Sequence, residues 1–176
     1  MAVILAQRGG PDIETWPPPA YPGCVHVSFI CTGNICRSPI AAAVFRSHVD
    51  DAGLTDKVTI TSAGTGSWHI GEPCDPRAAA VLRARDYPVE HVATRVNAEH
   101  LNADLLLAAD AGHIDALIGL GVPPERARLL RSFDPDAPLD AEVPDPYYGA
   151  EGGFDEVLAM IEAAMPRLLD WVRERV

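Results

Sequence analysis

Short apolar runs alternate with amphipathic segments along most of the chain. The apolar runs predict strands over Val25–Ile30, Val58–Thr61, Asp104–Ala109 and Arg128–Leu130. The amphipathic segments predict helices over Ile40–Val49, Arg77–Arg85, Ala111–Leu120 and Phe154–Arg175, the third of them capped by Asp110. Strands that alternate with helices indicate an α/β fold in which a four-stranded parallel sheet carries helices on both faces. Ligands of such sheets bind at the carboxyl ends of the strands.

The first 22 residues do not share this pattern. They are rich in proline and glycine, with Pro17-Pro18-Pro19 at their centre, and they show no periodicity. We therefore predict a flexible N-terminal extension over residues 1–22 and a single domain over residues 23–176. A domain of this size can bury about 70% of the surface of its unfolded chain, which is enough for a stable core.

The first predicted strand leads directly into Cys31-Thr32-Gly33-Asn34-Ile35-Cys36-Arg37-Ser38-Pro39. A thiol at a strand end, a tight loop and a helix start form a phosphate-binding loop, because loop N–H groups and the helix N-terminus converge on one anion. Arg37 can add a bidentate fork to the same anion. This field would stabilise a thiolate on Cys31 and make it a good nucleophile. The alternative is a strand–turn–helix with a buried structural cysteine, since the Cys-x5-Arg spacing alone is weak evidence.

Three further segments accompany this loop: the run from Thr61 to Gly71, the tetrapeptide Asp75-Pro76-Arg77-Ala78, and Asp145-Pro146-Tyr147-Tyr148-Gly149. In this order, from about Val25 to the C-terminus, they resemble the low-molecular-weight protein tyrosine phosphatase family. The stretch Leu130-Arg131-Ser132-Phe133-Asp134-Pro135 is similar to the mycobacterial and other actinobacterial members in particular. The resemblance implies a phosphatase that hydrolyses phosphotyrosine through a phosphocysteine intermediate, with no metal or other cofactor.

The resemblance also implies roles for individual residues. Cys31 is the expected nucleophile, Arg37 holds the phosphate, and Asp145 is first the general acid and then the general base. Substrate contacts are expected from the rest of the loop and from nearby aromatic side chains: Thr32, Gly33, Asn34, Ile35, Cys36, Ser38, Trp68, Tyr147 and Tyr148. Asn34, Ser62 and His91 match a hydrogen-bond network that supports the loop, although His91 taken alone fits a surface position equally well.

Other phosphorylated substrates and other activities remain alternatives. Ile35 and the Tyr147-Tyr148 pair favour phosphotyrosine. The arginine-phosphate phosphatases of the family that this chain resembles look to carry Thr at the position of Ile35 and Phe-Gly at the position of the two tyrosines. Arsenate reductases share this type of loop, and a form that uses an external small thiol fits the cysteine count, whereas a thioredoxin-coupled form needs a cysteine pair beyond Cys74. A module that only binds phosphotyrosine would lack Cys31, Arg37 or Asp145, and all three are present.

The net charge of −11 argues against nucleic acids and anionic membranes as partners. The expected partners are proteins that contain phosphotyrosine, with a cognate tyrosine kinase as a further candidate. Local donors such as Arg37 must then outweigh the global charge within the Debye length of about 8 Å. A cytoplasmic location is predicted, because no apolar stretch approaches the roughly 20 residues that span a bilayer and Met1–Ala6 lacks the features of a signal peptide. Export by a non-classical route stays open.

The four cysteines show no paired framework, which indicates a reducing compartment. Cys36 lies in the same loop as Cys31, and we predict a redox switch in which oxidised Cys31 forms a disulfide with Cys36. The alternative is that Cys36 only packs beneath the loop. Cys24 and Cys74 are expected to be packing residues, and Asp75 with Arg77 a helix cap and its charge partner. The histidines have no metal-ligand spacing, so no metal site is expected.

Overall fold

The computed structural model describes residues 23–150 and 152–176, so the predicted extension over residues 1–22 lies outside the described residues. Four parallel strands form one sheet in the order β2-β1-β3-β4. Their bounds are β1 Val25–Cys31, β2 Val58–Gly64, β3 Leu105–Ala108 and β4 Ala127–Leu129. All four predicted strands are confirmed, and β2 continues to Gly64 rather than ending at Thr61.

The helices also follow the predicted order. They are α1 Arg37–Asp51, α2 Pro76–Arg83, α4 Ala111–Gly119 and α5 Gly153–Arg173, with 3-10 turns at Thr55–Lys57, Pro124–Arg126 and Leu130–Phe133. Asp110 caps α4 as predicted, because its side chain accepts a hydrogen bond from the backbone N of His113. A one-turn helix, α3 Ala98–Leu101, was not predicted, since a single turn carries no hydrophobic period.

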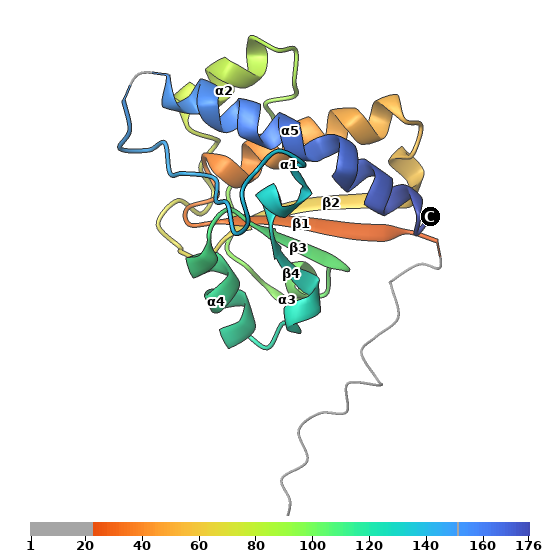
Figure 1. Cartoon of the computed structure of the whole chain (residues 1–176). Helices are drawn as coiled ribbons and strands as arrows, with labels where there is room; N and C mark the ends of the chain where they lie inside the picture. The colour runs from red at the N-terminus through yellow and green to blue at the C-terminus, as the bar shows by residue number, and fades with distance from the viewer. Residues whose placement is uncertain (1–22, 151) are drawn as a thin grey trace, which may run out of the picture.

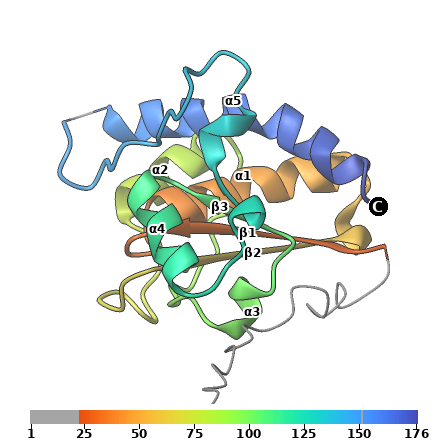
Figure 2. The same ribbon diagram turned by 60° about the horizontal axis from the view of Figure 1, so that its bottom comes forward.

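Helices cover both faces of the sheet, as predicted (Figure 1). Helices α1, α2 and α5 lie on one face and α3 and α4 on the other, and Figure 2 shows the same two layers from a second direction. The larger core includes Phe29 of β1 and Phe45 of α1, whose rings meet edge to face with centroids 5.8 Å apart. Ile30 of β1 faces the second core, beneath α4. Burial on both faces explains why β1 is almost continuously apolar.

The carboxyl ends of β1 and its two neighbours form one edge of the sheet. The register pairs Cys31 with Gly64 on β2 and Ile30 with Ala108 on β3. A Cβ on Gly64 would lie 2.6 Å from the carbonyl O of Thr32, so glycine is what allows the loop after β1 to cross the end of β2. The chain passes from β1 through α1 to β2 on one side, and the connection after β2 returns to β3 on the other side of β1. This reversal of direction beside β1 is the switch point where such sheets bind ligands. Among the residues that the structure describes, no helix is long and apolar enough to cross a membrane.

Candidate active site

The loop after β1 curls around the N-terminus of α1. At its centre Asn34 is fully buried and adopts φ +56°, a left-handed conformation that asparagine tolerates better than most residues. Helix α1 begins without a side-chain cap and has no acidic residue in its first turn. The first N–H groups of α1 are therefore not claimed by a capping side chain, and a helix N-terminus of this kind favours an anion.

Two hydrogen-bond donors surround the sulfur of Cys31. The backbone N of Asn34 donates to Sγ at 3.3 Å, and the Ser38 hydroxyl lies 2.9 Å from it. The Ser38 Oγ already accepts a hydrogen bond of 2.8 Å from Asn34 Nδ2, so its own hydrogen is free to point at the sulfur. Donors aimed at a sulfur stabilise the thiolate form, and the local geometry therefore suits a nucleophile at Cys31.

The side chain and carbonyl of Asn34 connect the loop to its neighbours. Nδ2 donates to Ser62 Oγ at 3.0 Å, and Oδ1 accepts from the backbone N of Thr94 at 2.9 Å. His91 Nε2 donates to the carbonyl O of Asn34 at 2.6 Å. Burial lowers the pKa of His91, which keeps the ring neutral with its hydrogen on Nε2. The structure thus brings Asn34, Ser62 and His91 together, and Thr94 is a member that the sequence did not reveal.

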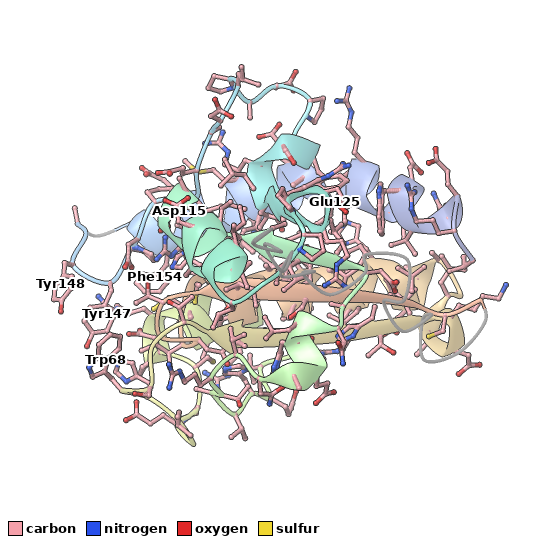
Figure 3. All side chains as sticks on the ribbon, turned by 90° about the horizontal axis from the view of Figure 1, so that it is seen from below. Trp68, Asp115, Glu125, Tyr147, Tyr148 and Phe154 are labelled. Atoms are coloured by element: carbon pink, nitrogen blue, oxygen red, sulfur yellow. The ribbon has the colours of Figure 1, made fainter. Side chains whose placement is uncertain are left out.

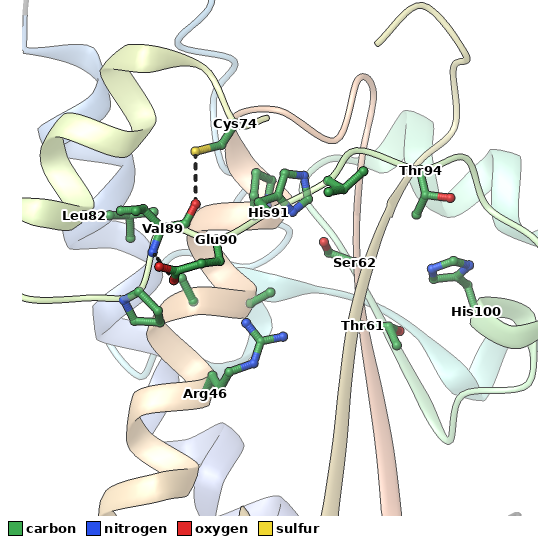
Figure 4. Close-up of a pocket in the computed structure, with 15 residues that line it drawn as sticks. Arg46, Thr61, Ser62, Cys74, Leu82, Val89, Glu90, His91, Thr94 and His100 are labelled. Carbon is green, nitrogen blue, oxygen red and sulfur yellow. Dashed lines mark hydrogen bonds between the residues drawn. The ribbon is translucent and has the colours of Figure 1, made fainter. Parts of the chain in front are cut away.

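A cavity of about 300 Å³ lies behind this network (Figure 4). Ser62, His91 and Thr94 are among its lining residues, and Arg46 of α1 faces them from the other side. Cys74 borders the same cavity and is buried, while Cys24 is only partly buried. Among the described residues no group of three or more His, Cys, Asp or Glu side chains could hold a metal ion.

Arg37, the first residue of α1, is only 4% exposed, and both of its terminal nitrogens are engaged. Nη1 donates to Asp110 Oδ2 at 2.9 Å and to the carbonyl O of Val143 at 3.0 Å. Nη2 donates to Thr32 Oγ1 at 3.4 Å and to Asp145 Oδ2 at 3.3 Å. A planar guanidinium fixed at several points cannot rotate freely, so its orientation toward the loop is set in advance.

Asp145 lies across from the loop on a segment bounded by two prolines, and its side chain is 49% exposed. Its Oδ1 accepts a hydrogen bond of 3.1 Å from the backbone N of Tyr147. Arg77 tethers this segment to α2, because its Nη1 donates to the carbonyl O of Tyr147 at 3.1 Å and its guanidinium lies over the rings of Tyr147 and Phe154. Asp75 caps α2 and pairs with Arg77, as predicted.

These side chains surround a cavity of about 370 Å³. Its lining residues are Cys31, Thr32, Gly33, Ile35, Cys36, Arg37, Trp68, His69, Asp145, Tyr147 and Tyr148. Figure 3 shows Trp68, Tyr147 and Tyr148 together at one edge of the molecule. Trp68 and Tyr148 are 74% and 93% exposed, so they form the rim rather than a closed wall. Asn34 in the loop and Ser38 in α1, both predicted as substrate contacts, are buried and are not among the lining residues.

Three residues around this cavity were missed as site residues. His69 lies over Gly33, where an added Cβ would come within 2.9 Å of its ring, and its Nδ1 contacts Glu72 Oε2 at 2.7 Å. Asp110 was recognised only as a helix cap, and His113 only as a histidine without metal spacing. Asp110 follows β3, the neighbour of β1, and this position at the carboxyl end of a strand was the available signal.

A cysteine in an anion-binding loop, faced by a buried arginine and a half-exposed carboxylate, defines a phosphatase site on a doubly wound sheet. Residues 26–176 match the family model described as "Low molecular weight phosphotyrosine protein phosphatase". The chain belongs to this family, as the sequence motifs predicted.

Individual relatives agree with this assignment. The chain is 54% identical over 153 residues to low molecular weight protein-tyrosine phosphatase A of Mycobacterium tuberculosis, which covers 86% of this chain and 94% of that protein. A crystal structure of a protein tyrosine phosphatase from Entamoeba histolytica superposes with a TM-score of 0.79 at 34% identity, covering 85% and 97% of the two chains. The structure of a Drosophila arginine phosphatase gives a TM-score of 0.75 at 27% identity, covering 82% and 96%.

Proposed function

We propose that this protein is a tyrosine phosphatase that cleaves phosphotyrosine in proteins through a phosphocysteine intermediate. One observation carries the proposal: Arg37 Nη2 donates to both Thr32 of the loop and Asp145, in a cavity that Cys31 also lines. The nucleophile, the phosphate-binding guanidinium and the proton donor therefore meet around one space. The family membership and the similarity to named tyrosine phosphatases support the same reaction.

The first half-reaction transfers the phosphoryl group to sulfur. The Cys31 thiolate attacks phosphorus in line, an S–P bond forms, and the bond between phosphorus and the tyrosine oxygen breaks. Asp145 gives its proton to the departing oxygen, so that tyrosine leaves as a neutral phenol. Arg37 and the loop N–H groups hold the three equatorial oxygens and stabilise the charge that accumulates on them.

The second half-reaction returns the enzyme to its starting state. Asp145, now a carboxylate, takes a proton from water while the water oxygen attacks phosphorus. The S–P bond breaks, inorganic phosphate leaves, and Cys31 is again a thiolate. The same donors serve both steps because the phosphoryl group passes through a similar charge distribution each time.

The walls of the cavity support an aromatic substrate. Ile35 gives the loop an apolar side chain, and Tyr147 and Trp68 present aromatic surface at the cavity. Phosphoarginine remains the second candidate substrate, because a Drosophila arginine phosphatase shares the fold. A panel of phosphotyrosine, phosphoserine and phosphoarginine peptides, with arsenate reduction measured alongside, tests the proposal. We expect phosphotyrosine to be turned over with the highest kcat/KM, and a preference for phosphoarginine or arsenate would contradict it.

We further propose that oxidation controls the enzyme. Cys36 lines the same cavity as Cys31, and burial together with the nearby Asp75 raises the pKa of Cys36 to about 12. Cys36 therefore stays a thiol while the Cys31 thiolate reacts first with peroxide and becomes a sulfenic acid. The Cys36 sulfur then attacks the Cys31 sulfur, a disulfide forms, and the sulfenic hydroxyl leaves as water with the Cys36 proton.

We propose that residues 23–176 form the whole catalytic domain and that residues 1–22 are an extension not needed for catalysis. The support is that β1 begins at Val25 and that the family match begins at residue 26. A cytoplasmic location, with phosphotyrosine proteins and a cognate tyrosine kinase as partners, agrees with four unpaired cysteines in the structure.

A further inference from the structure

Four side chains form a closed ring of polar contacts beside the phosphate cavity. His113 Nε2 lies 2.9 Å from Thr32 Oγ1, and His113 Nδ1 lies 3.0 Å from Asp110 Oδ1. The other oxygen of Asp110 accepts from Arg37 Nη1 at 2.9 Å, and Arg37 Nη2 donates to Thr32 Oγ1 at 3.4 Å. Thr32 and Arg37 line the cavity, whereas Asp110 and His113 do not. The ring of contacts therefore links two residues outside the cavity, the buried His113 and the partly exposed Asp110, to two groups that line it.

The chemistry of the ring fixes the direction of each hydrogen bond. Two groups of Asp110 approach His113 Nδ1: the carboxylate Oδ1 at 3.0 Å and the backbone N at 3.3 Å. The backbone N of Asp110 donates a hydrogen bond to Nδ1, whereas Oδ1 accepts from the backbone N of His113 and is only a near neighbour of Nδ1, so Nδ1 is an acceptor. In a neutral ring Nε2 then carries the hydrogen and donates it to Thr32 Oγ1. Thr32 Oγ1 thus accepts from both His113 Nε2 and Arg37 Nη2, which fixes the position of this oxygen.

Several charged groups act on His113, and they oppose each other. Burial is the largest influence and lowers the pKa of His113, as does Arg37, whereas Asp110, Asp145 and Glu142 raise it. Because burial prevails, the ring is neutral near pH 7, so Nδ1 can accept from Asp110 while Nε2 donates to Thr32.

We infer that His113 is a positioning residue of the reaction, which orients the Thr32 hydroxyl and, through Asp110, the Arg37 guanidinium. This inference rests on the proposed function. His113 touches neither phosphate nor the reacting atoms, and it acts by keeping the Thr32 oxygen turned toward Nη2. Without it, the hydroxyl can rotate and Arg37 loses one of the acceptors that hold its plane against the loop.

A purely structural role would explain only half of this geometry. Helix α3 carries the same local arrangement, in which His100 Nδ1 lies 2.8 Å from the side chain of its cap residue Asn97, and His100 is also 4% exposed. The imidazole of His100 also forms a hydrogen bond with the backbone of Ser62 on β2. Capping thus accounts for the Nδ1 contact of both histidines, but it does not account for the bond from His113 Nε2 to a side chain of the catalytic loop.

Substitutions at position 113 separate the two contacts. Asparagine places its amide near the position of Nδ1 and loses the contact with Thr32, whereas glutamine reaches the position of Nε2 and restores an N–H donor for Thr32 Oγ1. We expect His113→Asn to lower kcat about tenfold and to weaken competitive inhibition by inorganic phosphate, the scale of one lost hydrogen bond. His113→Gln should recover most of kcat. Adding Thr32→Val to His113→Asn should cause little further loss, because both changes remove the same bond.

The matched control is His100→Asn, which removes the corresponding imidazole from α3. We expect it to lower Tm about as much as His113→Asn does while kcat and phosphate inhibition stay near the wild-type values. If His113→Asn lowers only Tm, or if its effect on kcat adds fully to that of Thr32→Val, His113 is a structural cap and the inference is overturned.

Nitrogen NMR of the full-length protein shows which imidazole nitrogen of His113 carries the hydrogen, and it needs no measurement of activity. At pH 7 we expect His113 to be a neutral imidazole with its hydrogen on Nε2 and an unprotonated Nδ1. A hydrogen on Nδ1 would overturn the inference whatever the substrate is, because Nε2 would then have no hydrogen to donate to Thr32. Conversely, the expected tautomer in a protein that does not hydrolyse phosphotyrosine would show that the proposed function, and not the ring geometry, is wrong.

Discussion

Arg37 and Asp145 share a hydrogen bond of 3.3 Å between Nη2 and Oδ2. The guanidinium that is proposed to hold phosphate therefore also binds the proposed proton donor. A phosphate group that enters the cavity competes with the Asp145 carboxylate for Nη2, since both are anionic acceptors. If Asp145 is the proton donor as proposed, substrate entry is expected to free it from Arg37 and to allow it to approach the leaving oxygen.

Replacing the nucleophile should separate binding from turnover. Cys31→Ser should lower kcat by more than about 10⁴-fold, because a serine hydroxyl is a poor nucleophile without a base. Phosphate and phosphotyrosine should still bind, since Arg37 and the loop N–H groups are unchanged. Isothermal titration and steady-state kinetics measure the two properties, with Cys24→Ser as the control outside the cavity. Turnover within tenfold of the wild type would rule out the covalent mechanism.

The loss of kcat on replacing Asp145 should depend on the leaving group of the substrate. Asp145→Asn should lower kcat by roughly 10²–10⁴-fold for phenyl phosphates with basic leaving groups and much less for activated aryl phosphates. It should also strengthen phosphate binding, because a carboxylate no longer competes for Arg37. Asp140→Asn is the matched control, an exposed aspartate of the same segment whose φ of +58° suits asparagine equally. Equal losses along the leaving-group series would show that Asp145 is not the proton donor.

Substrate preference should respond to the loop side chain at position 35. Ile35→Thr replaces an apolar wall of the cavity with a hydroxyl, which provides a partner for a guanidinium and removes surface that packs on a phenyl ring. We expect the ratio of kcat/KM for phosphoarginine to that for phosphotyrosine to rise several-fold, within the roughly 10–200-fold range of single-group discrimination. Ile70→Thr, exposed and outside the cavity lining, is the control. An unchanged ratio would refute this explanation of selectivity.

Peroxide treatment tests the proposed disulfide. The wild type should lose activity and regain it with a thiol reductant, whereas Cys36→Ser should recover poorly because Cys31 proceeds to sulfinic acid. Peptide mapping should find a Cys31–Cys36 link in the oxidised wild type. Cys74→Ser, which removes another buried cysteine, should behave like the wild type. Equal recovery of the wild type and Cys36→Ser, without the link, would leave Cys36 as a packing residue.

The pairing of Asp75 with Arg77 predicts a pH-dependent contribution to stability. The hydrogen bonds from Arg77 hold the pKa of Asp75 below its usual 3.8. A depressed pKa stabilises the folded state at pH values above 3.8, and this contribution disappears as the pH falls through the folded-state pKa. Urea denaturation should therefore show the wild type more stable than Asp75→Asn at pH 5–7, and this difference should shrink as the pH falls below 3.8. Because asparagine keeps the helix cap, Asp75→Ala should cost a further ~1 kcal/mol at every pH. A difference between wild type and Asp75→Asn that does not change with pH would contradict the ion pairing.

The fold could be predicted because each main element has a local pattern. Strands β1 and β3 are continuously apolar since helices cover both of their faces, and the long helices show a clear period. The end of β2 was missed because its last residues are small or polar and are ordered by pairing with β1. Helix α3 was missed because its single turn is specified by the contact between Asn97 and His100 rather than by a hydrophobic face.

The candidate site likewise has one part that the sequence predicts and another that it does not. The loop with Cys31 and Arg37 is contiguous in sequence, so its residue types and their spacing are enough to indicate an anion site. The contacts of Asp110 with Arg37 and of His113 with Thr32 join residues 73 and 81 positions apart, and no local signal reveals such pairs. Only the position of Asp110 after the strand beside β1 hinted that α4 contributes to the site.

The conformation and the contacts of Asn34 limit which residue types can occupy position 34. Its backbone adopts a left-handed conformation. Its buried side chain donates hydrogen bonds to two hydroxyls and accepts one from the backbone N–H of Thr94. Glycine would suit the backbone and lose every one of these bonds, and aspartate would bring a charge and no donor. Asparagine meets both demands, because it tolerates the left-handed region and carries both an amide donor and a carbonyl acceptor. The central residue of the loop thus serves the backbone conformation and the hydrogen-bond network at the same time.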